Sequence, residues 1–118
     1  MSLTPPPPDF AILTNVGLEI QLQDEWGGRI ESIADPRNLL GDLLPSDEKS
    51  DTYPMLVGID PYGDTLFNPL QIPRFLAEWA DVVSNARTQE GRELVSEIER
   101  LARRCANEVH TYLKFIGD

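Results

Sequence analysis

The 118-residue sequence has few of the features that mark several common classes of protein. Its single cysteine excludes an internal disulfide and fits the reducing environment of the cytoplasm, where we expect the protein to be located. No apolar run approaches the roughly 18 residues of a membrane-spanning helix, so we expect no membrane contact. The N-terminus has no basic region followed by an apolar core, so no signal peptide is predicted. A glycine-rich phosphate loop is also missing.

Positive charge is scarce as well, because 20 Asp and Glu residues face 10 Lys and Arg residues and give a net charge of -10. Residues 1–68 hold twelve acids against three bases, a net of -9, whereas residues 69–118 hold eight acids against seven bases, a net of -1. A negative field argues against nucleic-acid binding, which requires the opposite sign. It would speed encounter with a basic protein, or it would only keep the chain soluble.

The composition is that of a globular protein, with 41% apolar and 25% charged residues. Residues 1–9 include four consecutive prolines, each of which has a fixed φ and no N–H group. We therefore predict a flexible proline-rich arm at residues 1–9, followed by a single domain at residues 10–118.

Strand patterns fill the first part of this domain. Residues 10–13 are a short apolar run that could form a strand, and residues 18–23 alternate between apolar and polar side chains. The alternation predicts a second strand, one face of which is buried. That face holds Leu18, Ile20 and Leu22.

A hairpin is predicted next. Residues 24–28 are glycine-rich and suit a turn, with Trp26 at its tip. This indole is either an exposed contact residue or folds back over the sheet edge, and we favour the second arrangement. Residues 29–33 return as a strand whose broken alternation suggests a bulge near Glu31 and Ser32.

The middle of the chain combines a short helix with a further strand. Asp35 and Pro36 suit a helix start, and the leucines of residues 39–44 share one helical face before a polar loop at residues 45–54. Residues 55–59 are apolar on both faces and predict a central strand. Residues 60–65 predict a sharp turn, in which Gly63 could take a positive φ, and Leu66 and Phe67 begin a paired strand.

Two long helices and a last strand complete the pattern. Pro73 fits the first turn of one helix, and Thr88 suits the N-cap of the next. Residues 111–116 are typical of a strand. The first apolar helix face holds Phe75, Leu76, Trp79, Val82 and Val83, and the second holds Leu94, Ile98, Leu101, Cys105 and Val109.

Because strands come mostly first and helices mostly later, we predict an α+β fold. An antiparallel sheet of four or five strands would be packed with one short helix and two longer C-terminal helices.

Three stretches of the sequence resemble a family of small, acidic, uncharacterised bacterial proteins. They are IDPYGDTLFN at residues 59–68, LARRC at residues 101–105 and YLKFIGD at residues 112–118. The resemblance extends from about Leu18 to Asp118 and leaves out the proline arm. It implies no activity, because the family has none assigned, and therefore no catalytic residue can be transferred from it.

Candidate sites for chemistry are few. Asp60 and Asp64 flank a tight turn and could bind Ca²⁺ or Mg²⁺, but they lack the spacing of an EF-hand and a third acid in register. Cys105 and His110 would point about 140° apart on a helix, and Cys105 lies on the apolar stripe, which favours a buried side chain. We therefore expect no catalytic residues, no cofactor and no enzymatic activity.

The arginines near the end of the last helix have three interpretations. Glu99 and Arg103 have the spacing of an i,i+4 ion pair. The cluster of Arg100, Arg103 and Arg104 could complement the helix dipole, bind an anion or an acidic partner, or pair with acids of the N-terminal half inside the fold.

We therefore predict a non-enzymatic protein–protein interaction module that resembles an immunity or inhibitor protein and offers an acidic face to a basic partner. The candidate partner-binding residues are Trp26, Asp47, Glu48, Asp51 and Tyr62. One alternative is a small metal- or ligand-binding protein that uses the turn from Asp60 to Asp64. Another is a homodimer that pairs through helices or a sheet edge.

Overall fold

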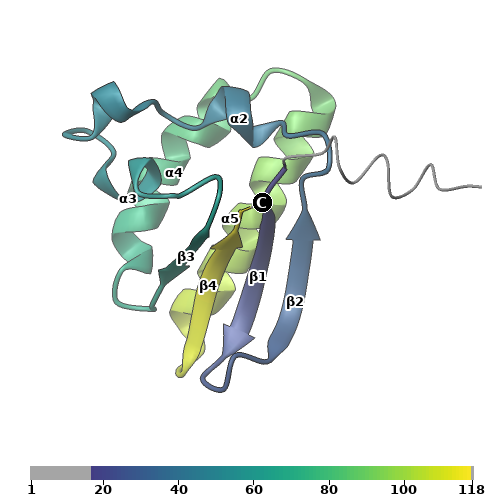
Figure 1. Cartoon of the computed structure of the whole chain (residues 1–118), viewed down its shortest axis with the longest axis vertical. Helices are drawn as coiled ribbons and strands as arrows, with labels where there is room; N and C mark the ends of the chain where they lie inside the picture. Colours follow the sequence, from purple (N-terminus) through teal and green to yellow (C-terminus); the bar gives the residue numbers. More distant parts are fainter. Residues whose placement is uncertain (1–16, 118) are drawn as a thin grey trace, which may run out of the picture.

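A computed structural model of the chain describes residues 17–117 and has an α+β architecture (Figure 1). One antiparallel sheet has the strand order β2-β1-β4-β3, which confirms the predicted fold class. The proline arm and the strand expected at residues 10–13 lie outside the described residues. The strands are β1 (Glu19–Asp24), β2 (Arg29–Ala34), β3 (Asp64–Phe67) and β4 (Thr111–Ile116).

The two central strands, β1 and β4, contribute every second side chain to the core, because successive side chains of a strand point to opposite faces of the sheet. Ile20 lies opposite Phe115 and Leu22 lies opposite Leu113, and all four side chains are fully buried. Leu18 is also buried, so the predicted apolar face of the first described strand is confirmed.

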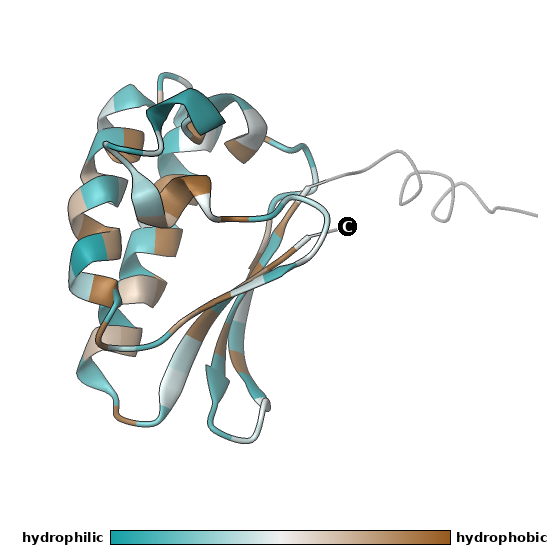
Figure 2. Ribbon diagram, turned by 60° about the vertical axis from the view of Figure 1, so that its left-hand side comes forward, coloured by the Kyte–Doolittle hydropathy of each residue, from teal (hydrophilic) through white to brown (hydrophobic). Residues whose placement is uncertain are grey.

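Two long helices cover this apolar face of the sheet and run in opposite directions (Figures 1 and 2). α4 (Ile72–Asn85) begins with Pro73 in its first turn, and α5 (Gln89–Asn107) begins after Thr88, whose Oγ1 accepts a hydrogen bond from Gly91 N at 3.0 Å. The indole Nε1 of the buried Trp79 donates to the carbonyl of Val95 at 3.0 Å, so α4 is bonded to α5 inside the core. Among the described residues, no helix is long and apolar enough to cross a membrane.

The hairpin between β1 and β2 forms as predicted, with Gly27 at φ +82° in the left-handed region that favours glycine. The bulge lies at Ile30, one position before the predicted place, because Leu22 pairs with Glu31 while Gln23 pairs with Arg29. The preferred position of Trp26 is wrong: the indole is 86% exposed at the hairpin tip and does not fold over the sheet.

The central strand predicted at residues 55–59 is also wrong, because this stretch contains the short helix α3 (Pro54–Val57). A run of five apolar residues fits a buried strand or a buried helix equally well, and Pro54 suits the first helical turn. β4 takes the central place in the sheet instead.

Two further short helices precede α3. α2 (Leu40–Leu43) is the predicted short helix but begins later than expected, and the 3₁₀ helix η1 (Asp47–Lys49) occupies part of the predicted polar loop.

The apolar stripe of α5 is confirmed at Ile98, Leu101 and Cys105, which are fully buried. It fails at Val109, which is 81% exposed, because α5 ends at Asn107 and the chain turns through His110 at φ 60° into β4. The helical periodicity therefore stops before Val109.

Candidate partner-binding surface

Many of the acids that have no ion-pair partner in the described part of the chain lie in one stretch, which we call the acidic segment and define as residues 42–60. It runs from α2 through η1 and α3 and contains five acids against one base, Lys49. All five carboxylates are exposed to solvent. They belong to Asp42, Asp47, Glu48, Asp51 and Asp60.

None of these five carboxylates lies within ion-pair distance of a described basic side chain. Asp60 has only local partners, because its Oδ1 accepts from Tyr62 N at 2.8 Å. Exposed acids without counter-charges keep their field in the surrounding water, where it can act on an approaching partner.

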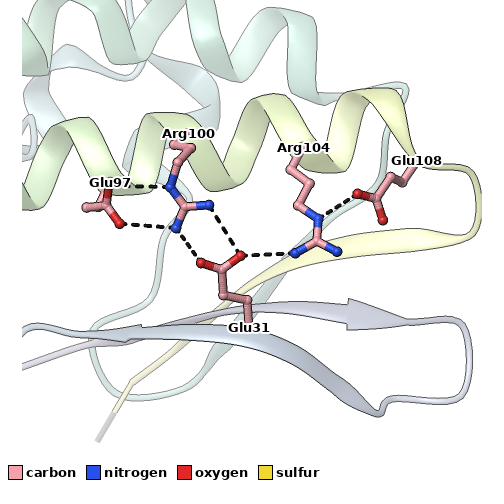
Figure 3. Close-up of polar contacts among 5 residues, drawn as sticks. All are labelled: Glu31, Glu97, Arg100, Arg104 and Glu108. Atoms are coloured by element: carbon pink, nitrogen blue, oxygen red, sulfur yellow. Dashed lines mark hydrogen bonds and ion pairs between the residues drawn. The ribbon is translucent and has the colours of Figure 1, made fainter.

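Three arginines near the end of α5 are in the opposite state, because glutamates of the same molecule pair with Arg100, Arg103 and Arg104. Figure 3 shows the contacts of Arg100 and Arg104. Glu31, on β2, bonds to Arg100 and lies 3.1 Å from Arg104 Nη1, and Glu108 lies 2.5 Å from Arg104 Nε. Arg103 lies 2.6 Å from Glu99, which confirms the predicted i,i+4 pair.

Of the three interpretations of this cluster, pairing with the N-terminal half inside the fold is confirmed by Glu31. The hydrogen bonds and positive charge of Arg100 and Arg104 hold the pKa of Glu31 below its usual value, although partial burial opposes them. The same contacts raise the pKa of Arg100. The positive charges of Arg100, Arg103 and Arg104 are therefore compensated within the molecule.

Two buried carboxylates hold the acidic segment in place, and both act as remote helix caps. Asp35 is 2% exposed and accepts from Leu39 N at 2.8 Å and Leu40 N at 2.9 Å, at the start of α2. Its predicted capping role is confirmed, although the helix starts farther along the chain. Such bonds satisfy N–H groups that a short helix leaves without partners.

Glu78, on α4, does the same for α3. Its side chain is 6% exposed, and Oε1 accepts from Met55 N and from Leu56 N, each at 3.0 Å. Arg74 Nε lies 3.5 Å from the other carboxylate oxygen. Tyr53 OH also donates to Asp81 on α4 at 2.6 Å, and this bond is the main cause that raises the tyrosine pKa. α3 is thus tied to a rigid long helix.

A groove of about 400 Å³ lies beside the acidic segment, between α2, α3 and the turn that precedes β3. Apolar side chains dominate its wall, and Asp47 reaches its margin. Tyr62 lines it and is 78% exposed. The apolar lining residues are Leu18, Leu44, Pro45, Leu56, Val57, Ile59 and Pro61.

The predicted partner-binding residues therefore fall into two groups. Tyr62 and Asp47 share the groove, and Glu48 and Asp51 lie on the same acidic segment. Trp26 is at the other end of the sheet, because β4 meets the β1–β2 turn at its start and the β3 turn at its end. Trp26 does not belong to this surface.

The turn from Asp60 to Asp64 is built by internal bonds. Asp60 N donates to Thr65 Oγ1 at 2.9 Å, and Lys114 Nζ lies 3.3 Å from Asp64. Gly63 does not adopt the positive φ that the sequence allowed. Within residues 17–117, no group of three or more His, Cys, Asp or Glu side chains has the geometry to hold a metal ion.

Cys105 and His110 are not brought together. Cys105 is fully buried in the core, and burial raises the pKa of its thiol. His110 is exposed beyond the helix end, where its Nδ1 lies 4.0 Å from Glu25. The expected structural role of the cysteine is confirmed.

Sequence reasoning missed the groove and the capping role of Glu78. The groove is lined by residues from separate parts of the chain, and no local pattern marks such a site. Glu78 carried one usable signal, an acid within the apolar face of an amphipathic helix. Comparisons with protein-family models, with curated proteins and with solved structures found no match to this chain.

Proposed function

We propose that this protein is a non-enzymatic, cytoplasmic interaction module, similar in manner to an immunity or inhibitor protein, that presents the acidic segment to a basic partner protein. The observation that carries the proposal is the contrast in charge pairing. The five exposed acids of the segment have no ion-pair partner among the described side chains, whereas Arg100, Arg103 and Arg104 of α5 are paired with glutamates of the same molecule.

This contrast supports binding because an unpaired acidic surface attracts a basic protein and orients it during encounter. A net charge spread evenly over the molecule would act without orientation and would serve solubility alone. The capped helices α2 and α3 also favour recognition, because a preorganised surface loses little conformational entropy on binding.

The test removes three charges from the acidic segment with the variant Asp47→Asn/Glu48→Gln/Asp51→Asn. Wild type and variant serve as bait in a native bacterial lysate at low and high salt, with quantitative mass spectrometry. We expect a basic protein that wild type retains, that salt elutes and that the variant loses. Its association rate with the purified variant should be at least about tenfold slower at low salt.

A matched control separates position from net charge. Glu25→Gln/Glu90→Gln/Glu93→Gln removes the same number of charges from exposed sites outside the segment. It should retain the partner and associate at a rate close to wild type. If both variants lose binding equally, net charge alone is responsible. If wild type retains no basic protein and elutes as a dimer, the homodimer alternative replaces the proposal.

A further inference from the structure

The groove and the acidic segment form one composite surface. Asp47 lines the groove itself, Asp42 follows the lining residue Gly41, and Asp60 lies between two lining residues, Ile59 and Pro61. The apolar cavity therefore has Asp47 in its lining, and Asp42 and Asp60 lie next to it along the chain. None of these three carboxylates has an ion-pair partner among the described side chains.

The apolar wall is accessible. Leu44, Pro45 and Val57 are only half-buried, and Tyr62 is largely exposed. A cavity of about 400 Å³ is at the lower end of the range for small-molecule sites, roughly 300–1,000 Å³, and suits one or two large side chains. The groove therefore has the size of a site for a side-chain anchor.

We propose, on the basis of the function proposed above, that the groove binds a large apolar side chain of the basic partner while flanking Lys or Arg residues meet Asp42, Asp47 and Asp60. Charge complementarity selects this occupant. An apolar ligand without charge would leave the carboxylates unmatched, and a cation without an apolar group would leave the cavity wall in contact with water. The binding segment of the partner is thus a short basic sequence around one apolar anchor.

The probe is a pair of short synthetic peptides that alternate lysine and serine and differ only at the central residue, which is leucine in one and serine in the other. Each is titrated into the full chain labelled with ¹⁵N. The leucine peptide should bind about tenfold more tightly or better at the same salt, because it buries an additional apolar side chain. Amide shifts should gather at Leu44, Val57 and Tyr62.

A groove-filling variant tests the location. Ser46 is exposed, lines the groove and makes no capping bond with its side chain, so Ser46→Trp fills the cavity without changing charge. It should reduce the affinity of the leucine peptide about tenfold, to that of the serine peptide, and leave the serine peptide unaffected. Ser50→Trp, at the other end of η1 and outside the groove, should affect neither peptide.

The outcomes separate this inference from the proposed function. If both peptides bind equally and Asp47→Asn/Glu48→Gln/Asp51→Asn weakens both, the groove assignment is wrong and the acidic surface stands. If that variant weakens neither peptide, the proposed function fails as well. If Ile12→Ser raises the affinity of the leucine peptide about tenfold, the chain's own apolar run at residues 10–13 fills the groove, and the partner assignment is overturned.

Discussion

Glu78 gives the sharpest test of how the acidic segment is held. We predict that Glu78→Ala destabilises the protein by about 3 kcal/mol and that Glu78→Gln does so by about 1 kcal/mol. The alanine variant removes both carboxylate oxygens, which accept hydrogen bonds from the N–H groups of α3. The glutamine variant keeps one amide oxygen as an acceptor but loses the negative charge.

The magnitude follows from the two N–H groups. Hydrogen bonds to a charged group contribute about 1.5–3 kcal/mol each, and a buried donor without a partner costs about 1–3 kcal/mol. Leu56 is 1% exposed, so water does not readily replace the carboxylate at its N–H, whereas Met55 is only half-buried and regains part of its bond from solvent. The larger share of the loss therefore arises at Leu56.

Urea unfolding followed by tryptophan fluorescence measures this loss. The signal comes mainly from Trp79, which is fully buried, since Trp26 is already exposed in the folded state. Glu93→Ala, at an exposed site on α5, is the control and should change stability by no more than about 0.5 kcal/mol. The reasoning is refuted if Glu78→Ala is no more destabilising than this control.

Three further predictions concern single side chains. Glu31→Gln should cost about 1 kcal/mol at neutral pH. Arg100 and Arg104 lower the Glu31 pKa in the folded state, so the stability difference between wild type and variant should be complete above the unfolded pKa of about 4.3 and should shrink as pH falls through the folded pKa. Urea unfolding at pH values from 7 to 3 tests this. A stability difference that stays constant with pH would contradict it. Cys105 should react with a thiol reagent only after unfolding, and rapid reaction in native buffer would disprove its burial. Trp26→Ser should change the free energy of unfolding by less than about 0.5 kcal/mol, and a larger loss of stability would show that the indole packs on the sheet.

The periodic spacing of apolar residues within single stretches of the sequence predicted most of the fold. The alternation at residues 18–23 and the apolar faces of the two long helices follow from which side chains must be buried, and each element is long enough for its period to be read. Thr88 capped α5 as expected because its partner, Gly91, lies only three residues away. Interactions of this range are encoded within a single stretch of sequence.

The failures share a dependence on distant residues. Residues 54–57 form a helix where a strand was predicted, partly because Glu78, more than twenty positions away, accepts the N–H groups at its start. Val109 follows the stripe of α5 in sequence, but β4 must begin at Thr111 to pair with β1, so the helix ends before it. Neither fact has a local signature.

Only the acidic part of the candidate surface could be predicted from the sequence. The charge difference between the two parts of the chain indicated an acidic N-terminal half, and Asp47, Glu48 and Asp51 lie on the segment without ion pairs. The groove could not be predicted, because Leu18 and Tyr62, far apart in the sequence, line the same groove only in the folded chain. Glu31, which belongs to the same acidic half, is used internally to neutralise arginines.

The position of β4 has a consequence for biosynthesis. This strand pairs with both β1 and β3, although it follows every other described element along the chain. A nascent chain halted before Thr111 would hold the β1–β2 hairpin and β3 as separate pieces, with Ile20 and Leu22 uncovered on one side. The sheet can close only after Ile116 has cleared the ribosomal exit tunnel. Until then, the apolar face of the hairpin is available to chaperones and to aggregation.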